Sequence, residues 1–233
     1  MHSYGFRQFF IGTLMFCALQ IGAVAVASAS PEIPKDDPAA MLRSATDQVL
    51  LIVEETKKQE NRNAQEYYQK IDAVLSQIVD LEYFARGVMA THASARRYKT
   101  LTNDNERKAF RERISHFSTV LKDSLMASYA DALLAFDGER ITWEPAPPSR
   151  DPDDITLTQI VHAKSGKNYS VQYRLHNTAK SGWLVQNVVV EGLNLGEAYR
   201  NQFAAAVESN KGNVDYVVEN WPKLMSKVAP ETK

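Results

Sequence analysis

Residues 167–203, KNYSVQYRLHNTAKSGWLVQNVVVEGLNLGEAYRNQF, carry the strongest strand signal in this chain. In the first half of the stretch apolar residues alternate with polar ones, which is the period of a strand with one buried face. The apolar positions are Tyr169, Val171, Tyr173 and Leu175. A polar turn ending in Gly182 leads to a second run, residues 183–191, rich in β-branched and aromatic side chains. The stretch therefore predicts a β-hairpin whose apolar face the rest of the chain must cover.

Helical spacing dominates most of the remaining chain. After the hairpin, Tyr199, Phe203 and Val207 recur every four residues, which places them on one helical face. Similar stripes predict further helices over residues 38–58, 68–78, 81–90 and 103–136, and from residue 213 onward. We expect Asp80 to be the N-cap of the third of these helices, and Pro222 to break or kink the last one.

Two further strands lie between the long helix and the hairpin. They cover residues 140–144 and 155–161, on either side of a loop, 145–152, that contains four prolines. Residues 92–101 read as a connection. Because helices come first, strands second and helices last, the order predicts an α+β fold with a mainly antiparallel sheet. Periodicity alone leaves open whether the helices and sheet pack solidly or enclose a cavity.

The N-terminus predicts a secretory signal peptide over residues 1–29. Arg7 precedes an almost wholly apolar run, residues 9–26, and small residues follow it. An uncleaved membrane anchor is the alternative, since the run is near the length that spans a bilayer. A lipoprotein processed at Cys17 is a third reading, and the bulky side chains before this cysteine disfavour it.

Cleavage would leave 204 residues (233 − 29), which suits one domain over residues 38–228 behind a flexible mature N-terminus, residues 30–37. The mature chain would carry 26 basic and 28 acidic residues, a net charge of −2 (26 − 28), and no cysteine. Disulfides are therefore excluded, and general nucleic-acid binding is disfavoured because it needs a clear basic excess.

The sequence shows no motif for nucleotide binding, zinc binding or serine-nucleophile chemistry. The histidines of the mature chain, His92, His116, His162 and His176, are scattered. Asp80 has a capping role available, and the acidic residues of 151–154 lie in the proline-rich loop. The sequence therefore points to no catalytic residue, metal-ligand set or cofactor.

A basic region is the densest charge cluster. Its members are Arg96, Arg97, Lys99, Arg107, Lys108, Arg111 and Arg113. A solvated loop and helix face is the favoured interpretation, and a docking patch for an acidic partner or a lipid headgroup is the alternative.

Four stretches together resemble one protein family. Residues 183–195 and 199–203 are the most similar, and residues 79–89 and 117–136 follow the family's pattern less closely. The family is that of the MlaC-type periplasmic phospholipid-binding proteins, also called the toluene-tolerance or ABC-transporter auxiliary family. The chain departs from its pattern at Val79 and Leu81, where aromatic residues are usual, and at Asn187, where Asp is frequent.

This resemblance implies a fold and a function. It implies N-terminal helices packed on a curved, mainly antiparallel sheet with C-terminal helices, enclosing an apolar pocket for the acyl chains of a phospholipid. It also implies a periplasmic carrier without catalysis, working between an outer-membrane lipoprotein complex and an inner-membrane ABC transporter with a ring of MCE domains, to maintain outer-membrane lipid asymmetry. The predicted lipid-binding residues are Phe84, Val88, Leu121, Leu125, Tyr129, Val171, Tyr173, Leu175, Val185, Val188, Val190 and Phe203.

Three other functions remain open on the sequence. The pocket could take another apolar cargo, such as a hopanoid, a quinone or an organic solvent. The scaffold could instead be an enzyme, which would require a carboxylate with a raised pKa inside the apolar cavity. A purely structural adaptor would have no cavity.

Overall fold

The computed structural model describes residues 32–135 and 138–228, and the predicted signal peptide lies outside these ranges. The helices are α2 (Pro38–Lys58), α3 (Ala64–Ile78), α4 (Leu81–Met89), the 3₁₀ helix η1 (Ala90–Ala93), α5 (Ala95–Lys99), α6 (Asp104–Ala135), α7 (Leu195–Ser209) and α8 (Val214–Val228). The strands are β1 (Gly138–Trp143), β2 (Asp154–Ala163), β3 (Asn168–Thr178), β4 (Gly182–Val190) and β5 (Leu193–Asn194). The chain is therefore α+β, as predicted.

The five strands form one sheet in the order β1-β2-β3-β4-β5, and every neighbouring pair is antiparallel. The predicted hairpin is its centre, with Val171 opposite Val190 and Tyr173 opposite Val188. Hairpin connections in sequence order need only short turns, which is why an antiparallel sheet can follow directly from local sequence.

A register shift interrupts the pairing of β3 with β4. Asn187 pairs with Arg174, but the next pair along the ladder joins Leu175 to Val185, so Gln186 is an extra residue in β4. In an uninterrupted strand Val185 and Gln186 would point to opposite faces. Here both side chains are buried, because the bulge turns Val185 back toward the helices.

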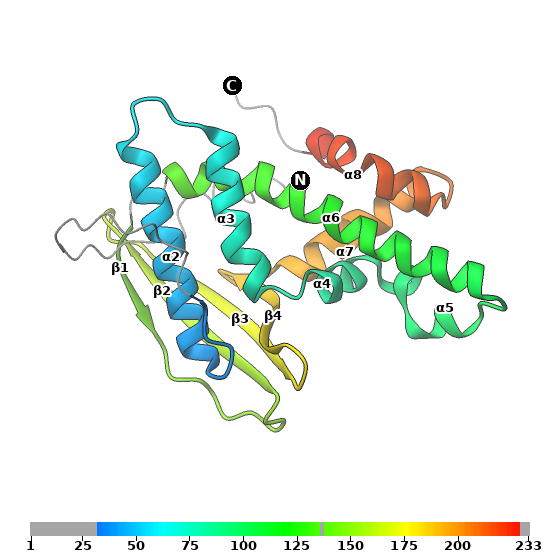
Figure 1. Ribbon diagram of the computed structural model, residues 1–233, viewed down its shortest axis with the longest axis horizontal. Helices are drawn as coiled ribbons and strands as arrows, with labels where there is room; N and C mark the ends of the chain where they lie inside the picture. The colour runs from blue at the N-terminus through cyan, green and yellow to red at the C-terminus, as the bar shows by residue number, and fades with distance from the viewer. Residues whose placement is uncertain (1–31, 136–137, 229–233) are drawn as a thin grey trace.

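The buried residues form two apolar clusters that share α6 (Figure 1). The first cluster lies between α2, α3 and the sheet, and it receives Met126 and Ala130 from the C-terminal half of α6. The second joins α4, α6, α7 and α8 around Trp221, whose ring meets that of Phe117 edge-on at 5.4 Å. In Figure 1, α6 crosses from the end with the sheet to the end with α5 and α8.

Side-chain caps fix two of the predicted helix starts. Asp37 caps α2 by accepting the Ala39 N–H at 2.8 Å, and Pro38 occupies the first helical position, where its missing N–H has no intrahelical partner to lose. Asp80 caps α4, as predicted, by accepting the Tyr83 N–H at 3.0 Å.

Two local predictions differ from the structure. Residues 92–101, expected as a connection, contain the end of η1 and the short helix α5, which has no apolar stripe and begins at its N-cap Ser94. The last helix continues through Pro222 to Val228, so the proline does not end it, while the alternative expectation of a kink stays a prediction. Proline removes one helical hydrogen bond, and burial of the adjacent Trp221 in the second cluster holds this turn in place.

The segment before α2 packs onto the sheet. Residues 30–37 were expected to be flexible, and the described part of them has Ile33 buried in the first cluster. The Lys35 carbonyl accepts the Trp183 N–H at 3.0 Å, which ties the segment to the start of β4. The limits of the single domain, residues 38–228, stay a prediction.

We predict that Gly182→Ala destabilises the protein more than Gly166→Ala does. Both glycines have positive φ, 67° and 80°, where a Cβ is strained. A Cβ at Gly182 would also lie 2.6 Å from the Lys35 carbonyl oxygen, whereas one at Gly166 would meet nothing within 4 Å. We expect urea unfolding to show losses of about 1 kcal/mol for Gly166→Ala and about 2 kcal/mol or more for Gly182→Ala. Equal losses would mean that the contact with Lys35 does not constrain the fold.

Candidate functional site

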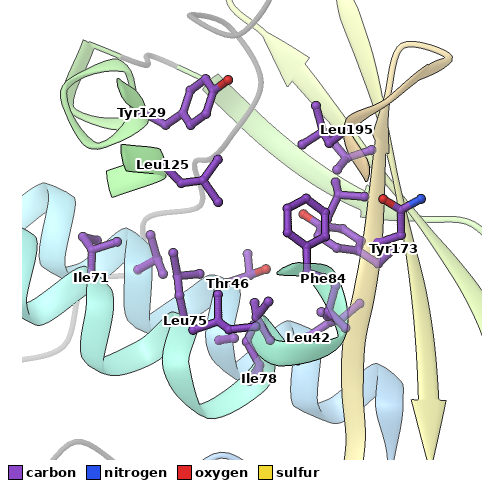
Figure 2. Close-up of a pocket in the computed structure, with 18 of the residues that line it drawn as sticks. Leu42, Thr46, Ile71, Leu75, Ile78, Phe84, Leu125, Tyr129, Tyr173 and Leu195 are labelled. Atoms are coloured by element: carbon purple, nitrogen blue, oxygen red, sulfur yellow. The ribbon is translucent and has the colours of Figure 1, made fainter. Parts of the chain in front are cut away.

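A cavity of about 270 Å³ lies between the hairpin and helices α2, α3 and α6, and most of its lining residues belong to the first cluster (Figure 2). The helices contribute Leu42, Ala45, Thr46, Val49, Ile71, Leu75, Ile78, Leu81, Phe84, Leu125, Met126, Tyr129, Ala130, Leu133 and Leu195, with Val79 at the α3–α4 junction. The hairpin contributes Val171, Tyr173, Val185, Gln186, Asn187, Val188 and Val190.

The periodicity of each element explains which side chains reach the cavity. Val171 and Tyr173 are two residues apart on β3, so both point to the face that the helices cover. Ile71, Leu75 and Ile78 follow the three- and four-residue spacing of one helical face. The lining is therefore the set of apolar faces that the sequence had to bury, with space left between them.

Eight of the twelve predicted lipid-binding residues line the cavity. They are Phe84, Leu125, Tyr129, Val171, Tyr173, Val185, Val188 and Val190. The other four lie elsewhere: Leu175 is packed in the first cluster, and Val88, Leu121 and Phe203 belong to the second. Whether any of these residues contacts lipid stays a prediction.

Three of the four residues outside the lining, Val88, Leu121 and Phe203, lie in the second cluster, which shares α6 with the first. Leu121 lies one turn before Leu125, and that turn is enough to move it from the cavity to the second cluster. Phe203 packs against Phe117, with ring centroids 5.0 Å apart, so most of α7 does not cover the cavity. Only Leu195, at the first turn of α7, reaches the lining.

Helices α2 and α3 contribute to the lining, although none of the predicted lipid-binding residues lies on them. The stripes of both helices were recognised, but a stripe shows only that a face is buried and not which surface it meets. Leu42, Thr46 and Val49 supply one wall from α2, and Thr46 carried no signal because a threonine near an apolar face is common.

No charged side chain belongs to this lining in the part of the chain that the structure describes. Its polar side chains are Thr46, Tyr129, Tyr173, Gln186 and Asn187. The carboxylate that an enzyme would need inside the cavity is not among the described lining residues. Such a site can remove apolar surface from water, and its few polar groups can orient a ligand by hydrogen bonds.

Hydrogen bonds of polar residues beside the cavity join β4 to the starts of α4 and α7. Asp80 N–H donates to the Val185 carbonyl at 2.9 Å, which connects the α3–α4 junction to the bulge in β4. Asn187 accepts the Gly196 N–H at 3.1 Å and donates to Asn194 Oδ1 at 2.9 Å. A Cβ at Gly196 would lie 2.8 Å from Asn187 Oδ1, so glycine permits this close approach.

Two tyrosine hydroxyls have shifted pKa values. Burial raises the pKa of Tyr173 above its ordinary value of 10.0. Burial also raises the pKa of Tyr199, and interaction with Tyr129, whose hydroxyl lies 2.8 Å away, raises it further. Both phenols are therefore neutral at physiological pH and act only as hydrogen-bonding groups.

The other chemical candidates from the sequence have local partners. His162 bonds Thr142 and Asn168, and His176 pairs with Asp154. In the basic region Arg113 pairs with Asp215 of α8. Residues 32–135 and 138–228 hold no cluster of His, Cys, Asp and Glu that could bind a metal ion. Within the same ranges no helix is long and apolar enough to cross a membrane.

Comparison with known proteins yields a family match and similarities to a curated protein and to a solved structure. The model of the MlaC protein family matches residues 43–223, more than half of the chain. The chain is 28% identical over 215 residues to the toluene tolerance protein ttg2D of Pseudomonas putida, covering 91% of this chain and 94% of that protein. A phospholipid-binding protein from Ralstonia solanacearum, solved in complex with a phospholipid, superposes with a TM-score of 0.66 at 22% identity. The superposition covers 82% of this chain and 98% of that one, and it shows a shared fold.

We predict a pH dependence of stability from the buried phenols. Because their folded pKa values lie above 10.0, the stability from keeping them neutral is complete below pH 10.0 and is lost as pH rises toward the folded pKa values. Between pH 10.0 and its folded pKa, each such tyrosine should lower the free energy of unfolding by about 1.4 kcal/mol per pH unit.

Urea unfolding below and above pH 10.0 measures how steeply the free energy of unfolding falls with pH. Tyr199→Phe should reduce the alkaline slope, and the control Tyr83→Phe should leave it unchanged because Tyr83 is exposed. An identical slope in wild type and Tyr199→Phe would contradict the assignment.

Proposed function

The chain belongs to the MlaC protein family, and from this premise we propose that it is a carrier that holds acyl chains of a phospholipid in the cavity between the β3–β4 hairpin and helices α2, α3 and α6. The observation that carries the proposal is the lining, which is apolar on every wall and has no charged side chain among its described residues. The phospholipid complex of the Ralstonia solanacearum protein with the same fold supports it.

The energetics suit a carrier that exchanges cargo with membranes. Burial of one methylene gains about 0.8 kcal/mol over water, so two acyl chains of about 15 methylenes each gain roughly 24 kcal/mol before any cost is subtracted. A bilayer offers a similar gain, so transfer between protein and membrane can be nearly balanced. The direction of transfer then depends on the partners.

The cavity volume sets a condition on loading. About 270 Å³ lies just below the range of roughly 300–1,000 Å³ typical of small-molecule pockets. For a whole diacyl lipid we infer that the helices covering the hairpin move outward or that part of the lipid stays outside the cavity. The C-terminal half of α6 is one of these walls, while its N-terminal half is held in the second cluster.

The place of this carrier follows from the family. We propose that the mature protein acts in the periplasm after removal of residues 1–29. Its partners would be an outer-membrane lipoprotein complex and an inner-membrane ABC transporter with a ring of MCE domains. Shuttling of lipid between them would maintain outer-membrane lipid asymmetry and tolerance to toluene. The carrier needs no catalytic residue.

A second candidate is a carrier for another apolar cargo, such as a hopanoid, a quinone or an organic solvent. The modest cavity volume favours the smallest of these, an organic solvent. Native mass spectrometry of protein purified without detergent separates the two, because a diacyl lipid and a smaller molecule add different masses.

The central test places a charge in the cavity. Val171→Glu should abolish co-purification of phospholipid, since a carboxylate cannot be desolvated beside an acyl chain without a partner. The matched control is Gln172→Glu, which adds a charge at the next residue of β3, where the side chain is exposed. Phospholipid should be quantified by mass spectrometry of the extracted, folded protein.

A second variant guards against misfolding, because Val171 is almost fully buried. Leu125→Glu introduces the charge from α6, at a half-buried side chain of the opposite wall. Normal phospholipid content in folded Leu125→Glu and Val171→Glu would overturn the proposed site.

A further inference from the structure

Two hydrogen bonds join three polar side chains at the apolar cavity. The Tyr173 hydroxyl donates to Gln159 Oε1 at 2.9 Å, and Gln159 Nε2 donates to Thr46 Oγ1 at 3.3 Å. The three residues come from β3, β2 and α2. Thr46 and Tyr173 line the cavity (Figure 2), whereas Gln159 is fully buried behind them.

The amide of Gln159 cannot satisfy both hydroxyls as donors. An amide oxygen accepts and an amide NH₂ group donates, and the two hydroxyls lie at opposite ends of this amide. The hydroxyl at the oxygen can therefore give its hydrogen to the amide, and the hydroxyl at the nitrogen must accept. In the observed arrangement Tyr173 is the donor, so the hydroxyl hydrogen of Thr46 is left over. Among the described residues Thr46 Oγ1 makes no hydrogen bond other than the one it accepts from Gln159.

The unpaired hydroxyl hydrogen of Thr46 makes binding of a purely apolar cargo less favourable. A cavity-facing hydroxyl can be satisfied by water while the site is empty. A hydrocarbon chain that displaces the water leaves the hydroxyl unpaired, and burying an unpaired polar group is unfavourable. A cargo that carries an oxygen at this depth avoids that loss, because the oxygen accepts the hydrogen.

We propose that Thr46, positioned by Gln159 and Tyr173, is a specificity-determining residue that hydrogen-bonds an oxygen atom carried on the cargo chain inside the cavity. The proposal rests on the proposed function, because it assigns a preference among the lipids that the cavity takes. The shared chemistry is a hydrogen-bond acceptor on an otherwise apolar segment. Two sources fit it, namely the ester carbonyl of an acyl chain and a hydroxyl group within the chain.

Competition between matched phospholipids tests the proposal. Delipidated mature protein is incubated with equimolar pairs of phosphatidylglycerols of equal chain length, and the bound ratio is read by native mass spectrometry. One arm pairs a mid-chain hydroxylated lipid with its unsubstituted counterpart, and the other pairs a diacyl lipid with its diether analogue. We expect wild type to prefer the oxygenated member in one arm by about 3- to 10-fold, as for one neutral hydrogen bond. The arm that shows the preference identifies the source.

Two variants connect the preference to Thr46. Thr46→Val has nearly the same shape and keeps Gln159 covered, so the ratio should fall to about 1 through loss of one hydrogen bond. Thr46→Ser retains the hydroxyl and should retain the preference. Tyr83→Phe removes a hydroxyl from an exposed side chain outside the lining and should also leave the preference unchanged. Thermal unfolding of each variant is recorded in parallel.

The outcomes separate the two proposals. Ratios near 1 in both arms for wild type, or a preference that survives in Thr46→Val, would overturn the role of Thr46 while leaving the carrier function intact. A lower unfolding temperature in Thr46→Val with an unchanged ratio would show that the three residues only tie α2 to the sheet. If wild type loads none of the four lipids, the proposed function fails, and this inference fails with it.

Discussion

The pairing of β3 with β4, with one extra residue at Gln186, is the constraint on which the rest of the structure depends. The extra residue lets Val185 and Gln186 both turn toward the helices, which a regular strand forbids. The Val185 carbonyl then accepts the Asp80 N–H, and Asp80 caps α4. Through this contact the bulge sets where α3 ends, where α4 begins and where the cavity is bounded between them.

The two apolar clusters have different physical roles because they are packed differently. In the second cluster Phe117, Phe203 and Trp221 interlock with centroid distances of 5.0–5.8 Å, and their volume fills the space between four helices. The first cluster leaves a cavity between the hairpin and its covering helices. Since close packing supplies much of a core's stability, the solid cluster can anchor α6 while the cavity remains available for cargo.

The polar groups of the cavity matter because they are few. Apolar burial rewards any hydrocarbon equally and cannot select among lipids by itself. Hydrogen-bonding groups fixed in an apolar wall are sensitive to what they face, since leaving one unpaired is costly. In the proposed role of Thr46, this wall of the cavity would therefore matter more for selection than its small share of the lining suggests.

The sequence by itself determined the fold class, most element boundaries and the apolar face of the hairpin. These depend on local periods of 2.0 and 3.6 residues and on caps such as Asp80, which act within a few residues of the chain. Only the tertiary structure decided which buried faces enclose space and which pack solidly. A stripe such as Leu121 and Leu125 marks a buried face but does not identify the surface that it meets. Here both residues pack with the second cluster, and only Leu125 also lines the cavity. The bond from Gln159 to Thr46 joins residues 113 positions apart, and no local pattern encodes it. Periodicity predicts which side chains are buried, and the shape of the surfaces that meet them decides whether they contact protein or face the cavity.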